Sequence, residues 1–308
     1  MVSKSLAQQV PVMLLYVLQS TGSSPGRQGF FMAVNAAGDM EGSIGGGIME
    51  HKFVEMAKER LLQPEEPAIK KQYHNKSAPA NQSGMICSGE QTILLYQVSP
   101  SDAAAIQNIM NGNGTLQLSP QGIRFFPEAP PYDYYFSEKE WVYREKLGYR
   151  NHLHIIGGGH CSLALSQLMH CLDFYIHVYD DRPRIKTLLN NTWAHEKTTV
   201  AHYSQLADMV PSGEQHYVVV MTVGYRTDDI AIRALWDKSF RYFGILGSKS
   251  KMDKMFEVYI AEGIPAEKLQ HMHAPIGLTI HSQTPEEIAV SIAAEIIRVK
   301  NHPAPPIP

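Results

Sequence analysis

The chain of 308 residues is poor in cysteine. Its thiols are Cys87, Cys161 and Cys171, an odd number without a C-x-x-C pair. Such sparse cysteine use excludes a small extracellular domain stapled by disulfides, and it predicts a protein of the reducing cytoplasm. Histidine pairs at 152/154 and 271/273 have no cysteine or carboxylate at the spacing of a zinc site, so they do not predict a metal centre.

The sequence also lacks an excess of charge and long apolar runs. Its 27 Lys and Arg residues stand against 30 Asp and Glu residues, for a net charge of −3. Without long basic runs, nucleic acid is not expected as the main partner. The longest apolar stretches, 12–18 and 218–223, have the length of strands rather than of membrane spans. We therefore expect no membrane partner either.

Two glycine-rich loops are present, and each leads into a predicted helix. The first, Gly42–Gly47, precedes a helical pattern over 48–62. The second, Gly157-Gly158-Gly159-His160, follows the apolar strand 153–156. Glycine lets a ligand approach the backbone, and unpaired N–H groups at the start of a helix favour phosphate. The two loops predict a protein that binds a phosphorylated cofactor.

The second half alternates strands and helices regularly. Apolar strands are predicted at 153–156, 175–179, 199–203, 217–223 and 242–246, with helices between them. This order is typical of a parallel sheet covered on both faces. The last helix is predicted to begin at Thr284, with Pro285 in its first position and Glu287 three residues after the cap.

The predicted fold class is therefore α/β, with two domains. An N-terminal α+β domain spans 1–125, and a Rossmann-like, doubly wound parallel-sheet domain spans 151–308. The segment 126–150, rich in proline, tyrosine and charge, is predicted to be a linker, with one edge strand within it as an option.

The second glycine loop partly matches the dinucleotide fingerprint G-x-G-x-x-G. Gly157 and Gly159 match, while Ser162 stands in place of the third glycine. About 20 residues later, Asp180 and Asp181 follow the next predicted strand, where an acid would hold a ribose hydroxyl. The pattern indicates a nucleotide-type phosphate site, and the alternative is a plain strand-to-helix turn in which the glycines only ease packing.

Loops after the fourth and fifth strands belong to the same predicted site, because ligands of parallel sheets bind beyond the carboxyl ends of the strands. His160 is compatible with a contact to phosphate or to a flavin- or pterin-like ring, and equally with a bond to its own backbone. The candidate cofactor-binding residues of this half are Gly157, Gly158, Gly159, His160, Asp180, Asp181, Gly224 and Gly247.

The first half contributes a second set of candidates. Ser23 and Arg27 lie in a turn suited to an anion, although such a turn is also ordinary. Glu50 suits the helix dipole, and with His51 it alternatively forms an acid and base pair. Cys87 stands in a loop with Gly84, Ser88 and Gly89 as a candidate metal ligand or sulfur acceptor, whereas Cys161 and Cys171 are expected to be packed. The candidates are Ser23, Arg27, Gly45, Gly46, Gly47, Glu50 and Cys87.

Several motifs in one order resemble a known family, the xanthine dehydrogenase accessory proteins of the XdhC/CoxI type. They are Ser23–Gly26, Gly42–Gly47, Gly84–Gly89, Gly157–His160, Asp180–Pro183, Gly244–Lys249, and Ala274–Leu278 with Thr284–Glu287. The resemblance implies an XdhC/CoxI-type domain followed by a Rossmann-like domain.

It further implies a chaperone without turnover that binds the molybdenum cofactor (molybdopterin). Such a protein supports sulfuration of the cofactor by a cysteine desulfurase and delivers it to a xanthine-dehydrogenase-type apoenzyme, often as a homodimer. On this reading Ser23, Arg27 and the first glycine loop hold the cofactor phosphate, and Cys87 faces the dithiolene–metal end. Two alternatives stay open: an oxidoreductase that binds NAD(P) in the second half, and a scaffold that has lost its ligand and dimerises.

Overall fold

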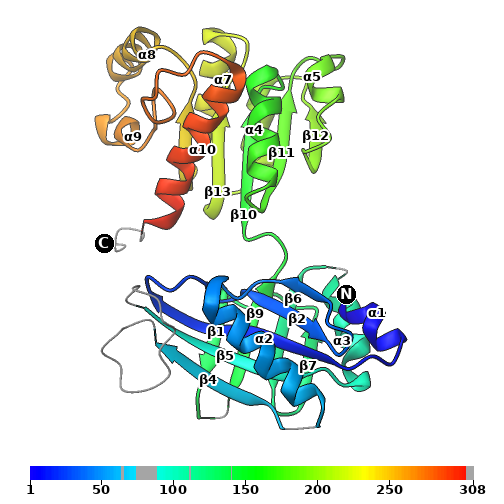
Figure 1. Ribbon diagram of the computed structural model, residues 1–308. Coiled ribbons are helices and arrows are strands. Elements are labelled where there is room, and N and C mark those ends of the chain that lie inside the picture. The colour runs from blue at the N-terminus through cyan, green and yellow to red at the C-terminus, as the bar shows by residue number, and fades with distance from the viewer. Residues whose placement is uncertain (64–65, 74–88, 111, 140, 303–308) are drawn as a thin grey trace. The chain divides into compact units, whose positions relative to one another are not determined.

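The computed structural model describes residues 1–302 except 64–65, 74–88, 111 and 140. The polypeptide forms two compact units, an N-terminal unit over Met1–Gly148 and a C-terminal unit over Tyr149–Pro308 (Figure 1). Among the helices in the described ranges, none is both long and apolar enough to cross a bilayer.

The first sheet of the N-terminal unit has five strands in the order β3-β2-β1-β5-β4, all paired antiparallel. Its central strand is apolar without alternation, and residues 12–18 are each at most 8% exposed, because both faces of the strand are covered. The helix α2 packs on one face through Met49 and Phe53. The strands and helices of this part are β1 (Val12–Gly22), β2 (Phe31–Asn35), β3 (Met40–Gly42), β4 (Ala68–Tyr73), β5 (Gly89–Gln97), α1 (Val2–Ala7) and α2 (Gly47–Leu61).

A second sheet, in the order β7-β6-β9-β8, packs on the other face of β1. Two of its strands lie in the range 126–150, so the prediction of a linker there was wrong. Tyr143 of β9 is fully buried, and its ring contacts Tyr16 of β1. Tyr143, which we interpreted as part of the linker composition, is thus a core residue. The elements are η1 (Pro100–Asp102), α3 (Ala103–Met110), β6 (Gly114–Ser119), β7 (Gly122–Phe126), β8 (Tyr134–Ser137) and β9 (Val142–Leu147).

The C-terminal unit contains the predicted parallel sheet, in the order β12-β11-β10-β13-β14. The chain runs outward from β10 to β12 and then returns to β13 on the other side, so the order reverses between β10 and β13. That reversal is where parallel sheets open a crevice for ligands. The strands are β10 (Asn151–Ile156), β11 (Phe174–Asp180), β12 (Glu196–Thr199), β13 (Gly213–Val220) and β14 (Phe240–Ile245). The third strand thus lies ahead of its predicted position at 199–203.

Helices cover both faces of this sheet. The pair α4 and α10 lies side by side on one face (Figure 1). The other face is covered by α6, α7 and α8. The last helix begins as predicted, with Thr284 accepting from the Glu287 N–H and the Glu287 carboxylate accepting from the Thr284 N–H. The helices are α4 (His160–His170), α5 (Lys186–Leu189), η2 (Tyr203–Gln205), α6 (Leu206–Met209), α7 (Tyr225–Leu235), α8 (Lys249–Ala261), α9 (Ala266–Gln270) and α10 (Pro285–Asn301).

One face of the parallel sheet carries a cluster of imidazoles. This histidine cluster consists of His152, His154, His177 and His216, from three neighbouring strands. Ring nitrogens of His154 and His216 lie 3.0 Å apart, and those of His152 and His177 lie 3.2 Å apart. Even here, no group of three or more His, Cys, Asp or Glu side chains in the described part of the chain is arranged to hold a metal ion.

Acid is expected to destabilise the C-terminal unit through His154, which is 1% exposed. Burial above all, and then the other imidazoles of the cluster and Lys238, lowers the pKa of His154 from 6.5 to about 2. Between these two values the unfolded chain binds a proton that the folded chain does not. Above pH 6.5 this histidine therefore costs the folded state nothing. As the pH falls below that value, the free energy of unfolding decreases by up to about 1.4 kcal/mol per pH unit.

Urea-induced unfolding of the full chain between pH 7 and pH 4.5 measures this effect. The variant His154→Gln should show a shallower loss of unfolding free energy with acid than the wild type, whereas His271→Gln, at an exposed position, should not. An identical pH slope for His154→Gln and the wild type would refute the assignment.

Candidate functional site

The second glycine loop leaves β10 at the point where the order of the strands reverses. Gly157 has φ +113, and a Cβ atom there would lie 2.3 Å from the carbonyl oxygen of Met221. Glycine is therefore required at this position by the close approach of the loop to the chain after β13. Gly159 differs, since a Cβ atom there would meet nothing within 4 Å. The loop is packed at its first glycine and open at its third.

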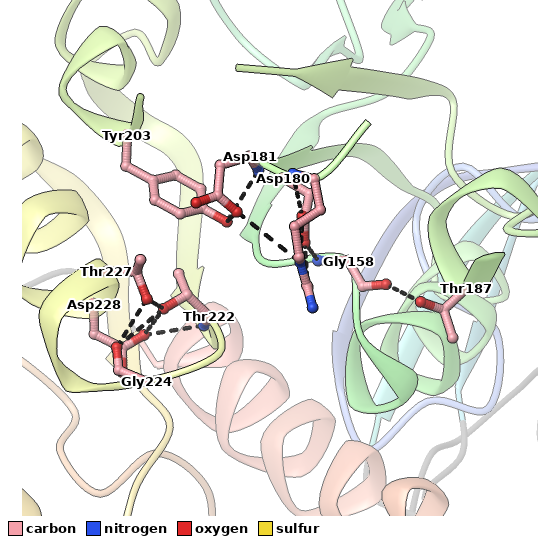
Figure 2. Close-up of polar contacts among 10 residues, drawn as sticks. Gly158, Asp180, Asp181, Thr187, Tyr203, Thr222, Gly224, Thr227 and Asp228 are labelled. Carbon is pink, nitrogen blue, oxygen red and sulfur yellow. Dashed lines mark hydrogen bonds and ion pairs between the residues drawn. The ribbon is translucent and has the colours of Figure 1, made fainter. Parts of the chain in front are cut away.

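A buried carboxylate holds the middle of this loop. The Gly158 N–H donates to Asp180 Oδ2 at 2.6 Å, and Asp180, at the end of β11, is 0% exposed (Figure 2). Arg182 donates to the same carboxylate from its backbone N–H and from Nε, each at 2.8 Å, and from Nη2 at 2.7 Å. Burial by itself raises the pKa of Asp180, but these hydrogen bonds outweigh it and lower the pKa below 3.8.

These contacts change the expected role of Asp180. We expected its carboxylate to hold a ribose hydroxyl, but it accepts four hydrogen bonds from the chain itself. Asp180 instead fixes the glycine loop to the end of β11. The neighbouring Asp181 keeps a side chain that is 33% exposed, and the Tyr203 hydroxyl donates to it at 3.3 Å (Figure 2).

Another buried carboxylate organises the loop after β13. Asp228 is 1% exposed and accepts from the N–H of Thr222 at 3.0 Å and from its hydroxyl at 2.6 Å (Figure 2). Lys251 pairs with its other oxygen. The hydroxyl of Thr227 donates to the carbonyl oxygen of Gly224 at 2.9 Å.

Gly247 is approached by two side chains of the helix that follows it. A Cβ atom on Gly247 would lie 2.7 Å from the side chain of Met252 and 3.0 Å from that of Lys251. Sequence reasoning missed the roles of Asp228 and Lys251, although each follows a strand and carries a charge opposite to that of the other. The structure brings the loops after β10, β11 and β13 together, as we expected.

The start of α4 remains available to a ligand. Gly159 caps this helix without a side-chain hydrogen bond, and His160 is its first residue. The first-turn N–H groups of an α-helix have no partner within the helix, and their dipole favours an anion. In the same turn the Ser162 hydroxyl is 1% exposed and has no hydrogen-bond partner among the described residues.

In the N-terminal unit, the turn 22–27 and the first glycine loop are locked together. A Cβ atom on Gly26 would lie 2.0 Å from the carbonyl oxygen of Ile44, and one on Gly45 would lie 2.5 Å from the Gly26 nitrogen. Gln91, which is 1% exposed, donates to both carbonyl oxygens, at 3.0 Å to Gly26 and 3.1 Å to Ile44. Sequence reasoning missed Gln91, because nothing in the pattern of a strand marks one glutamine as a bridge.

Glu50 occupies N–H groups that we expected to bind phosphate. Its Oε2 accepts from the Ser43 hydroxyl at 2.6 Å, the Ile44 N–H at 2.9 Å and the Gly46 N–H at 3.1 Å. Burial raises the pKa of Glu50, but the hydrogen bonds outweigh it and lower the pKa below 4.5. An external anion at this loop is therefore left with the N–H groups that follow Gly46, at the start of α2, where no side chain caps the helix.

The remaining candidates of the N-terminal unit surround these loops. Arg27 is exposed and donates to the Gly22 carbonyl oxygen at 3.2 Å. Ser23 lies in the same turn, and a Cβ atom on Gly89 would approach the Ser24 nitrogen to 2.5 Å. Cys87, two residues ahead of Gly89 in the sequence, lies outside the described residues.

The two described cysteines are free thiols, and they differ in exposure. Cys161 is partly buried and packs against the core of the C-terminal unit. Cys171 is exposed at the end of α4, so the expectation that it is packed was wrong.

Comparison with known proteins assigns both units. The model of the XdhC and CoxI family matches residues 5–72, and the model of the XdhC Rossmann domain matches residues 153–296. The chain belongs to the XdhC and CoxI family. The prediction of the family and of a Rossmann domain in the second half is thereby confirmed.

Two curated relatives cover different shares of this family member. The uncharacterized protein YqeB of Escherichia coli K12 is 25% identical over 300 residues, which are 96% of this chain and 44% of YqeB. A probable xanthine dehydrogenase subunit from Bacillus subtilis 168 is 27% identical over 170 residues, which are 55% of this chain and 49% of that protein. The chain thus spans less than half the length of either relative.

A solved structure agrees with the fold of the whole chain. The crystal structure of a xanthine dehydrogenase from Bacillus halodurans superposes with a TM-score of 0.67. It covers 97% of this chain and 94% of that chain at 22% sequence identity, a likeness that shows the fold alone.

Removing the Asp180 carboxylate should destabilise the C-terminal unit. In Asp180→Ala the Gly158 N–H and the Arg182 guanidinium lose their buried acceptor, so we expect a loss of about 2 to 4 kcal/mol of unfolding free energy. Denaturant unfolding measures it. The matched variant Asp181→Ala removes a partly exposed carboxylate and should cost less than about 1 kcal/mol. Equal losses for the two variants would show that Asp180 does not fix the loop.

Proposed function

We propose that this protein is an accessory factor of a xanthine-dehydrogenase-type molybdoenzyme. In this role the accessory factor binds the molybdenum cofactor and supports its sulfuration and its insertion into the enzyme. Family membership supports the proposal, as does the B. subtilis relative, whose name describes a probable component of a xanthine dehydrogenase. The observation that carries it is the open start of α4, because a cofactor carrier needs a place for a phosphate.

The residues at α4 fit the phosphate of molybdopterin. A Cβ atom on Gly159 would meet nothing within 4 Å, so there is space at the start of α4, and the buried Ser162 hydroxyl lacks a partner among the described residues. Main-chain donors at the start of a helix and a hydroxyl are the groups that bind phosphate in proteins. Bound there, the cofactor would supply its metal and dithiolene chemistry to the client enzyme, while this chain would bind and orient it.

The N-terminal unit would contribute the thiol. We propose that Cys87 accepts sulfur from a cysteine desulfurase during maturation of the cofactor, which is then delivered to the apoenzyme. A thiolate is both a nucleophile and a soft metal ligand, which suits this task. A second copy of the chain is a further proposed partner.

The alternative, an NAD(P)-dependent oxidoreductase, loses part of its support. It drew on Asp180 as the ribose ligand of the fingerprint. That carboxylate is 0% exposed and accepts four hydrogen bonds from Gly158 and Arg182. The geometry therefore favours a carrier of an anionic cofactor over a dehydrogenase that holds a ribose hydroxyl at this acid.

Gly159→Asp should abolish cofactor binding without harming the fold. Gly159 has an ordinary φ of −76 and open space around it, and aspartate is a favoured cap at the start of a helix. The new carboxylate would take the N–H groups of α4 and repel phosphate. We expect at least about a tenfold drop in molybdenum and pterin bound to protein purified from cells that make molybdopterin.

The control is Gly112→Asp, which places the same charge in open space in the N-terminal unit. It should keep the cofactor content of the wild type, and thermal unfolding should show both variants folded. Undiminished cofactor in Gly159→Asp would exclude α4 as the phosphate site.

Cys87→Ser should separate binding from sulfuration. Cofactor content should stay at the wild-type level, while activation of a xanthine-dehydrogenase-type apoenzyme by the purified protein falls at least about tenfold, because a hydroxyl is a far weaker nucleophile than a thiolate. Cys171→Ser, at the exposed free thiol, is the matched control and should activate normally. Full activation by Cys87→Ser would remove this thiol from the mechanism.

A further inference from the structure

Arg182 is held rigidly beside the second glycine loop. Its Nε and Nη2 atoms donate to the two oxygens of Asp180, at 2.8 and 2.7 Å, in a two-pronged contact. Nη2 shares the oxygen Oδ2 with the N–H of Gly158. The guanidinium therefore lies at the side of the loop, anchored by a carboxylate that is fully buried.

This anchoring leaves part of the guanidinium unused. An arginine side chain has five N–H donors in a fixed fork, and the contacts to Asp180 occupy its Nε edge. The side chain is 42% exposed. Donors that are not directed at Asp180 are thus presented to solvent, already oriented before any ligand arrives.

The same geometry selects the chemistry of a ligand. Asp180 has no exposed oxygen with which to accept from a ligand hydroxyl. A ligand group beside it meets the donors of Arg182 instead, and must itself accept hydrogen bonds. Arginine forks match the oxygens of phosphate. The partly exposed Asp181, whose carboxylate lies 4.0 Å from Arg182 Nε, is the opposing charge at this position.

Further cations follow Arg182 along the chain. The hydroxyl of Thr187 donates to the Gly158 carbonyl oxygen (Figure 2), and Leu188 would contact a Cβ atom on Gly158. This part of the chain, which includes the start of α5, therefore lies against the glycine loop. It carries Arg184 and Lys186, neither of which forms an ion pair within the described residues. The segment 180–186 thus carries three cations and two carboxylates, one of which is buried.

We propose that Arg182 is the specificity-determining residue of the C-terminal unit, and that it selects ligands with a phosphomonoester over ligands with a free hydroxyl at the end of β11. The inference rests on the proposed function for the ligand-binding edge of the sheet. It deepens that function by naming the class of group accepted at the end of β11, beside the start of α4 where the molybdopterin phosphate would bind. It excludes a contact between Asp180 and the ribose of an NAD-type ligand.

Calorimetric titration of the full chain with NADP⁺ and NAD⁺ tests the inference, because these two probes differ only in one 2′-phosphomonoester. The wild type should bind NADP⁺ at least about tenfold more tightly than NAD⁺. Arg182→Gln should remove this preference. Arg184→Gln, which removes the same charge two residues away, should keep most of it.

A third variant controls for misfolding, because Arg182→Gln leaves the buried Asp180 carboxylate without its ionic partner and could lose binding for that reason alone. Arg182→Lys keeps the charge but not the fork, so it should fold and retain only a preference of about threefold. Equal binding of the two probes by the wild type, or binding of neither, would overturn the inference. An equal loss of preference in Arg184→Gln and Arg182→Gln would also overturn it, because a diffuse basic surface would then suffice.

The experiment involves no molybdenum cofactor. If the titration shows no preference for NADP⁺, the proposed function is still tested by the cofactor content of Gly159→Asp. If the purified wild type contains no cofactor, the preference for NADP⁺ over NAD⁺ is still tested by the titration. The two proposals therefore fail separately.

Discussion

The structure of both glycine loops depends on one interaction, an internal carboxylate that accepts main-chain N–H groups. Asp180 performs it for the second loop and Glu50 for the first. In both cases hydrogen bonds outweigh the effect of burial and keep the acid ionised. A fixed negative charge thus stands where a bare loop would attract an anion, so binding of an external anion is displaced toward the first turn of the helix that follows.

The parallel sheet was predictable because its physical cause is local. Unbroken apolar runs such as 217–223 need cover on both faces, and only helices between parallel strands provide it. The start of α10 was equally local, since Thr284 and Glu287 satisfy each other's N–H groups within one turn. The strands of 126–150 were not predictable in this way. Tyr143 belongs to a strand that pairs with β6, more than twenty residues earlier, and its ring is buried against β1.

The candidate site was predictable as a set of positions but not as a set of contacts. Spacing alone placed Gly158 and Asp180 at neighbouring strand ends, and the structure brings them together. The sequence does not say whether the aspartate accepts from a ligand or from the loop. That choice depends on the depth of burial and on Arg182, two residues away. Gln91 was missed for the same reason, since its two acceptors lie 47 and 65 residues away.

The locked loops of the N-terminal unit have a mechanical consequence. The backbones of Gly26 and Gly45 are in close contact, so the turn at Arg27 and the segment before α2 have no room to slide past each other. The N–H of Ile44 in turn donates to the Glu50 carboxylate, which belongs to α2. We therefore expect the turn and the beginning of this helix to move together rather than independently.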